Sequence, residues 1–205
     1  RTPGLDAIAH VEPVDWGLIP ASHLGFDQVA SIAASIRAAQ QRPEVAGVVV
    51  VQGTDVIEET AYAFDLLCEP DPPVIVVGAM RNAADPGYEG PANLRDAVRV
   101  AASGRFAGEG ALVVMGGLVI PADDVAKTHT HAYDTFRPTN AGPVGTVRDG
   151  AIEHLARRPS TRRQIGMPIG PVPVVALVTA TIGSDGSPLR WAVAGRSEEH
   201  TSELQ

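Results

Sequence analysis

The sequence contains a single cysteine, Cys68, in 205 residues. One cysteine cannot form a disulfide framework within the chain, and it cannot supply a metal site built from several cysteines. The cysteine count leaves the cellular compartment open. We predict a cytoplasmic protein. The chain starts at Arg1 with neither a Met nor an apolar leader, so a signal peptide removed earlier stays an alternative.

Aromatic residues are scarce at 4%, and acidic residues exceed basic ones to give a formal net charge of −8. A protein that binds nucleic acid typically carries a basic surface and aromatic side chains that stack on bases, so this class is excluded. Long apolar runs are also missing, since none reaches the roughly 18 residues of a membrane-spanning helix. We therefore expect neither a nucleic acid nor a membrane as partner. The hydrophobic fraction of 44% is enough for a globular core.

Apolar stretches of strand length alternate with helically patterned stretches from residue 26 to residue 115. The pattern predicts helices at 26–41, 55–67 and 91–103, and strands at 46–51, 73–77 and 111–115. The run of valines within 46–51 is typical of a strand that is buried on both faces. This alternation predicts an α/β fold, in which helices cover both faces of a mostly parallel sheet.

The pattern changes after this region, and four parts of the chain are predicted. Short strands and turns from Val144 complete a first domain over 1–165, and the Gly- and Pro-rich stretch 166–173 is predicted to be a linker. A strand starting at Val174 is expected to open a smaller C-terminal α/β domain over 174–195. Residues 196–205 (RSEEHTSELQ) match the translated start of a common DNA-sequencing adapter. We therefore expect them to lie outside the fold and the natural protein to continue beyond Gly195.

Polar residues follow the first predicted strand directly, as Gln52-Gly53-Thr54-Asp55. Ligands of parallel sheets bind at the carboxyl ends of strands, and the start of the next helix offers free N–H groups there. Alternatively, Thr54 or Asp55 only caps the helix, because Asp55 and Glu58 have the spacing of a capping box.

Lysine is almost absent, since Lys127 is the only lysine among 16 basic residues. Arginine cannot release its proton near neutral pH, whereas a desolvated lysine can act as a base. The alternative is a solvated surface lysine without a chemical role.

Two histidines alternate in Thr128-His129-Thr130-His131, and on a strand both would point to one face. With Asp134 they could form part of a zinc site, but no fourth ligand is evident, so we favour a polar loop and expect no metal. Ser22 precedes the first predicted helix, where it either ends a loop or contacts a ligand.

Several short motifs occur together in a fixed order from Ser22 to Gly195, and together they resemble the bacterial-type L-asparaginases. The motifs are Gly53-Thr54-Asp55, Glu58-Glu59-Thr60-Ala61, Val77-Gly78-Ala79-Met80-Arg81, Gly90-Pro91 with Asn93-Leu94, Val113-Val114-Met115, Asp124-Val125 with Lys127-Thr128, Asp134-Thr135-Phe136, and Asn140 with Gly142-Pro143 and Gly145.

The resemblance implies an amidohydrolase that converts the side-chain amide of asparagine, and often glutamine, into the acid and ammonia without a metal or organic cofactor. It implies a catalytic set of Thr54, Asp55 and Lys127, with Ser22 on the substrate carboxylate, Asp55 on its α-amino group, and Gly53 beside the substrate. It also implies one left-handed crossover in the sheet, and a homodimer or homotetramer in which a neighbouring subunit completes each site.

The chain departs from the family pattern at its start. The Gly-Gly-Thr turn that carries the usual nucleophile, and the tyrosine that follows it, are not found before Ala9. Gln52 and Glu89 stand where histidine and aspartate are common. We expect the chain to begin after the nucleophile turn and to be inactive alone.

Two other functions are open at this point. One is the ammonia-producing subunit of a transfer-RNA-dependent amidotransferase. The other is a non-catalytic domain that binds a small ligand through Ser22 and Asp55 only.

Overall fold

Helices and strands alternate as the sequence pattern predicts in the computed structural model of the protein, which describes residues 2–157, 164–167, 173 and 175–194. The chain divides into two units, Arg1–Met167 and Pro168–Gln205. The elements of the first unit are η1 (Ala21–His23), α1 (Phe26–Gln40), β1 (Val48–Val51), η2 (Thr54–Val56), α2 (Ile57–Leu67), β2 (Val74–Val77), α3 (Gly90–Ala102), β3 (Ala111–Met115), β4 (Leu118–Pro121), β5 (Val125–Lys127), β6 (Phe136–Pro138), β7 (Gly145–Arg148) and β8 (Ala151–His154).

The predicted α/β class is confirmed, and the sheet is mixed. Six strands pair in the order β1-β2-β3-β4-β7-β8. The β1–β2 and β2–β3 pairs are parallel, whereas β3–β4, β4–β7 and β7–β8 are antiparallel. The β7–β8 turn places Asp149 and Gly150 at φ values of 50° and 79°, as a tight hairpin requires. The parallel half therefore comes from the alternating part of the sequence and the antiparallel half from the part after Met115.

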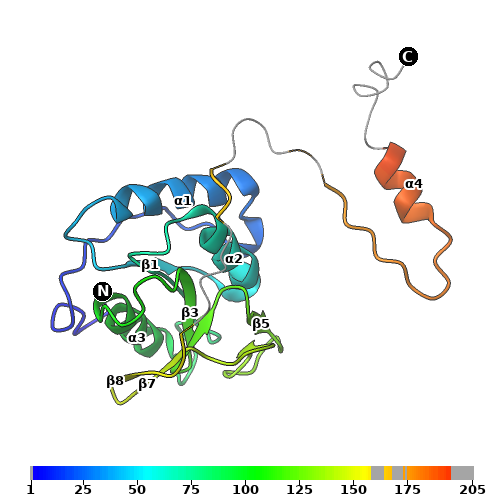
Figure 1. Ribbon diagram of the computed structural model, residues 1–205. Helices are drawn as coiled ribbons and strands as arrows, with labels where there is room; N and C mark the ends of the chain where they lie inside the picture. The colour runs from blue at the N-terminus through cyan, green and yellow to red at the C-terminus, as the bar shows by residue number, and fades with distance from the viewer. Residues whose placement is uncertain (1, 158–163, 168–172, 174, 195–205) are drawn as a thin grey trace. The chain divides into compact units, whose positions relative to one another are not determined.

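Helices cover both faces of the parallel half. Helix α1 packs on α2, and α2 packs on β2 and β3, while α3 contacts β1, β2 and β3. Figure 1 shows α1 and α2 on one side of the sheet and α3 on the other. Because β1, β2 and β3 are adjacent and successive, crossovers through α2 and α3 on opposite faces have opposite hands. One of them is therefore left-handed, which agrees with the expectation from the resemblance.

The prediction that the first valine-rich strand is buried on both faces was wrong. Strands β2 and β3 are fully buried, but β1 is only half-buried and its last residue, Val51, is 64% exposed. The reason is the position of β1 at the edge of the sheet, where, within the part of the chain that the structure describes, it has a hydrogen-bonded neighbour, β2, on one side only. The run of valines indicates a strand that is suited to a central position in a sheet, but it does not indicate whether a neighbour is present on each side.

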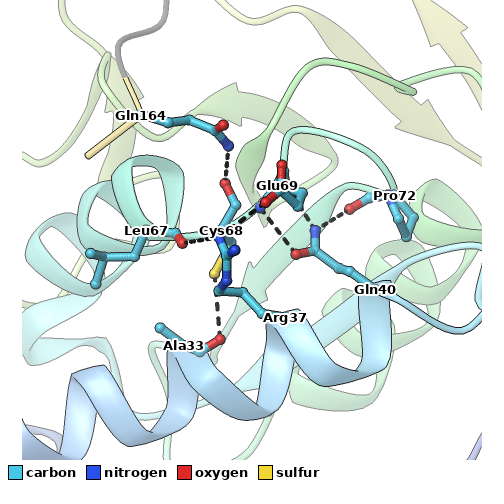
Figure 2. A network of polar contacts seen from close by, with 8 residues as sticks. All are labelled: Ala33, Arg37, Gln40, Leu67, Cys68, Glu69, Pro72 and Gln164. Atoms are coloured by element: carbon cyan, nitrogen blue, oxygen red, sulfur yellow. Dashed lines mark hydrogen bonds and ion pairs between the residues drawn. The ribbon is translucent and has the colours of Figure 1, made fainter. Parts of the chain in front are cut away.

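The carboxyl end of α2 is capped by side chains from elsewhere in the fold (Figure 2). The Arg37 guanidinium donates to the Leu67 carbonyl at 2.9 Å, and the Gln40 amide donates to the carbonyls of Glu69 and Pro72 at 2.8 and 2.6 Å. These contacts satisfy carbonyls that the helix and the following turn would otherwise leave unpaired.

Two further contacts close the same end of α2. The Gln164 side chain donates to the Cys68 carbonyl, and the Ile165 N–H donates to the Leu66 carbonyl at 3.0 Å. The Cys68 thiol lies in this network, and burial raises its pKa to about 12. Cys68 is therefore a core residue that stays protonated.

The second unit contains helix α4 (Ser187–Ala194). The predicted strand is not formed over 175–179, where Val175 and Leu177 are exposed. A strand requires a paired neighbour, and none lies beside this stretch among the described residues. The expected adapter-derived segment, 196–205, lies outside the described residues. None of the helices in the described part of the chain combines the length and apolar character of a membrane crossing.

The contacts at the end of α2 predict the effect of a single substitution. Gln40→Ala removes three hydrogen bonds to the main chain, including one from the Glu69 N–H, and should lower the free energy of unfolding by about 2 kcal/mol. Gln41→Ala is the matched control, because the neighbouring Gln41 side chain is exposed, and it should change stability by less than about 0.5 kcal/mol. Urea denaturation measures both, and equal effects would contradict the capping role.

Candidate active site

The lone lysine reaches the residues that follow β1. The Lys127 Nζ lies 3.0 Å from the Thr54 Oγ1 and 3.5 Å from the Asp55 Oδ1. The Lys127 side chain is only 17% exposed, whereas the Asp55 side chain is 64% exposed. A hydroxyl, a carboxylate and the only primary side-chain amine thus meet at the carboxyl end of a parallel strand, where ligands bind in such sheets.

This contact contradicts the interpretation of Thr54 and Asp55 as helix caps. The turn η2 precedes α2, and neither element has a side-chain hydrogen bond at its cap. The capping box, which the spacing of Asp55 and Glu58 left open as an alternative, is therefore absent.

Gly78 allows the carboxyl ends of β1 and β2 to lie close together. A Cβ atom at Gly78 would lie 2.7 Å from the Gln52 carbonyl oxygen and 3.1 Å from the Thr54 methyl group. Any larger residue would push the turn that carries Thr54 away from the sheet. The close contacts around residue 78 thus explain why glycine occupies the middle of the motif Val77-Gly78-Ala79.

Lys127 stands on a separate two-stranded hairpin formed by β5 and β6. The buried Asp124 holds one end of this hairpin, since its carboxylate accepts hydrogen bonds from Thr139, Asn140 and Ala141. Burial alone would raise the pKa of Asp124, but these hydrogen bonds lower it to about 2. The carboxylate is therefore ionised throughout the physiological range.

Glu58 holds the other end of the hairpin against α2. Its carboxylate accepts a hydrogen bond from the Lys127 main-chain N–H, and α2 packs on β5. The residue that lies one helical turn after Thr54 thus contacts the residue whose amine reaches Thr54. The spacing of Glu58 along the chain suggested only a capping box with Asp55 and gave no sign of this contact.

Ser22 lies in η1, which packs against η2. A Cβ atom at Gly53 would lie 3.0 Å from the Ala21 Cβ, so the two turns are in close contact. The Ser22 side chain is exposed. Ser22 and Gly53 are therefore brought to the same edge of the sheet as Thr54 and Asp55.

The two histidines after Lys127 belong to the loop of the hairpin. The His129 Nδ1 accepts hydrogen bonds from the N–H groups of His131 and Ala132 at 3.0 and 3.1 Å, so it is engaged within the loop. Among the described residues, no three His, Cys, Asp or Glu side chains are grouped so that they could hold a metal ion.

The same loop makes a contact that sequence analysis missed. Tyr133 donates to the Gly87 carbonyl at 3.1 Å, and the Arg81 guanidinium lies 3.9 Å from the centre of the Tyr133 ring. This cation–π contact joins the lysine-bearing hairpin to the loop between β2 and α3. A lone tyrosine in a polar loop gives no pattern that could have revealed the partner.

A cleft of about 650 Å³ lies beside the cluster, at the carboxyl ends of β1 and β2. Gln52, Gly53, Gly78 and Arg81 contribute to its walls, together with Leu18 from the N-terminal segment. Glu89, the second departure from the family pattern, accepts hydrogen bonds from the N–H groups of Met80 and Arg81 and so shapes the same wall.

The lowered pKa of Asp124 predicts how stability depends on pH. The folded-state pKa of about 2 is below the ordinary aspartate value of about 3.9, so the carboxylate adds stability above about pH 4 that is lost as the pH falls toward 2. Asp124→Asn should lower the free energy of unfolding at pH 7 by about 2 kcal/mol and flatten its decline between pH 4 and 2. Chemical denaturation at several pH values tests this, with Asp6→Asn in the exposed N-terminal segment as control. An unchanged acid profile in Asp124→Asn would contradict it.

Comparison with known proteins identifies relatives of this chain. A family model described as "Asparaginase, N-terminal" matches residues 1–160. The "Probable L-asparaginase periplasmic" of Haemophilus influenzae is 38% identical over 148 residues, which cover 70% of this chain and 42% of that protein. The "L-asparaginase 2" of Escherichia coli is 44% identical over 108 residues, which cover 53% of this chain and 31% of that protein.

A third relative extends the match further. The "Probable L-asparaginase" of Deinococcus radiodurans is 36% identical over 166 residues, covering 78% of this chain and 49% of that protein. The chain thus spans at most about half the length of these relatives. The match with the family model covers well over half of the 205 residues, and so the chain belongs to the asparaginase family.

Proposed function

We propose that this chain provides Ser22, Gly53, Thr54, Asp55 and Lys127 to the active site of an amidohydrolase that converts L-asparagine into L-aspartate and ammonia. The observation that carries the proposal is the 3.0 Å contact between the Lys127 Nζ and the Thr54 Oγ1. Family membership and the names of the relatives support it.

Lys127 and Thr54 form the reacting pair. In its neutral form the Lys127 amine takes a proton from the Thr54 hydroxyl, or from a water between them, as the resulting oxygen nucleophile attacks the amide carbon. The same proton then passes to the departing nitrogen, which leaves as ammonia as the C–N bond breaks. When a water is the attacking group, L-aspartate forms directly. When Thr54 attacks, a second water hydrolyses the resulting acyl ester, which releases L-aspartate and restores the Thr54 hydroxyl. The Lys127 side chain is largely shielded from water, so few solvent molecules compete for its contact with Thr54.

Asp55, Ser22 and Gly53 hold the substrate. The exposed Asp55 carboxylate is accessible to the α-ammonium group of an amino acid, and the exposed Ser22 hydroxyl can donate to its carboxylate. The N–H groups of the turn at 53–55 provide donors for the oxyanion that forms at the amide carbon. Fixing both ends of a zwitterion places its side-chain amide against the lysine–threonine pair.

The comparisons give no support to the two alternatives, an amidotransferase subunit and a non-catalytic binding domain. A homodimer or homotetramer, a cytoplasmic location, and activity on glutamine stay predictions. One relative's name places that protein in the periplasm. The name "Glutaminase-asparaginase" belongs to another relative, from Acinetobacter glutaminasificans.

Ammonia release from L-asparagine tests the proposed function. Because the relatives are longer than this chain, the assay uses a chimera in which residues 22–154 replace the corresponding part of the Deinococcus radiodurans relative, whose match with this chain spans 166 residues. The 205-residue chain, which we predict to be inactive alone, is assayed alongside. Lys127→Met should lower kcat/KM of the chimera by about a thousandfold or more, and Lys127→Arg should do the same because arginine keeps its proton.

Binding of L-aspartate provides the control for this assay. Lys127→Met should leave that binding within about threefold, while Asp55→Ala should abolish it. An active Lys127→Arg chimera would refute the role of Lys127 as a base. Binding without hydrolysis in an otherwise folded chimera would favour the non-catalytic alternative.

A further inference from the structure

The hairpin that carries Lys127 has little support of its own. It is a two-stranded sheet separate from the six-stranded one, and β5 has only three residues. Isolated two-stranded hairpins are marginal in water, so the position of Lys127 depends on what fastens the hairpin to the rest of the fold. Val125 and Phe136 are buried in the core and hold the hairpin through apolar contact.

At the lysine end of β5, apolar burial anchors the partner strand, because the buried Phe136 pairs with Lys127. Val125 lies at the opposite end of this strand, and the Lys127 amine reaches Thr54. At Lys127 itself, two hydrogen bonds connect the hairpin to the first turns after β1. One is the contact from Nζ to the Thr54 Oγ1, and the other runs from the main-chain N–H to the Glu58 carboxylate.

These two hydrogen bonds join Lys127 to two residues of the same short segment. Thr54 and Glu58 are four residues apart on consecutive turns of η2 and α2, and Lys127 contacts one with its side chain and the other with its main chain. A main-chain anchor removes the motion of the Lys127 backbone, so the remaining freedom of the amine is that of a side chain that is only 17% exposed. Glu58 is half-buried and is engaged by a charge-assisted hydrogen bond, which is stronger than one between neutral groups.

We propose that Glu58 is a positioning residue for the lysine–threonine pair: its carboxylate clamps the main chain of Lys127 to α2 and so holds the amine against Thr54. The inference rests on the proposed function for its catalytic meaning. The clamp itself can be measured without hydrolysis.

The experiment uses the full 205-residue chain and two readouts at Lys127. The first is hydrogen–deuterium exchange of the Lys127 main-chain N–H, with the N–H of Val76 in the buried strand β2 as an internal measure of global stability. The second is the rate at which an amine-reactive acylating reagent modifies the Lys127 Nζ. Peptide mapping separates this product from the N-terminal amine, and no other lysine competes.

Three variants isolate the contribution of the acceptor oxygen. Glu58→Ala should speed exchange at Lys127 by roughly tenfold or more relative to Val76, and should raise the acylation rate several-fold. Glu58→Gln keeps an acceptor oxygen and should restore both readouts to within about threefold of the wild-type chain. Glu59→Gln removes the same charge from the exposed neighbouring residue and should change neither.

Thr54→Val tests the two hydrogen bonds of Lys127 separately. It removes the hydrogen-bond acceptor of the amine and leaves Glu58 and the ion pair with Asp55 in place, so acylation should rise while exchange at the Lys127 N–H stays slow. The clamp is refuted if Glu58→Ala leaves Lys127 exchange within twofold of wild type, if Val76 accelerates equally, or if Glu58→Gln behaves like Glu58→Ala. Absence of L-asparagine turnover would count against the proposed function and would leave these readouts unchanged, so the two failures are distinguishable.

Discussion

The structure depends on one meeting point between two parts of the chain that are 73 residues apart: the Lys127 amine and the Thr54 hydroxyl. Thr54 is placed by the parallel half of the sheet, because it follows β1 directly and Gly78 allows the next strand end to lie against its methyl group. Lys127 is placed by a hairpin outside that sheet. The site therefore requires both the α/β scaffold and an attachment to it that no sheet hydrogen bond supplies.

Helix α2 connects this meeting point to the far side of the unit. Its first turn contacts the hairpin through Glu58, and its last turn is capped by Arg37 from α1 and by Gln164. The helix thus has polar anchors at both ends and a buried apolar side along its length, including Ile57, Ala61 and Phe64. Because both of its ends and one of its sides are held, α2 has little freedom to tilt or slide. Its first turn therefore gives Lys127 a fixed point of attachment.

Local sequence patterns predicted the scaffold well, since apolar periodicity and continuous valine runs are direct consequences of burial. The strand at 74–77 and the helix at 26–40 lie within a residue or two of the predicted ranges. The exposed edge of β1 and the unformed strand at 175–179 were not predictable in this way. A valine run encodes suitability for pairing, and whether a neighbour is present is a property of the tertiary structure.

The candidate site could likewise be predicted only in part from the sequence. A hydroxyl and a carboxylate after a strand, and a solitary lysine, could be singled out from residue chemistry. Their proximity, the Glu58 contact and the contact between Tyr133 and Arg81 depend on how the hairpin folds back, and no spacing along the chain specifies that. The alternative of a capping box at Asp55 and Glu58 is not realised for a related reason, because both carboxylates interact with Lys127, which is distant in sequence.

The register of the hairpin is fixed at both of its ends. Asp124 holds residues 139–141 beside the start of β5, and the Thr135 carbonyl accepts from the Thr128 N–H at the other end. An insertion of one residue on either strand between these ties would turn Phe136 out of the core or rotate the lysine away from the sheet. Changes in length among asparaginases of this kind should therefore be confined, in this part of the chain, to the loop between Thr128 and Thr135.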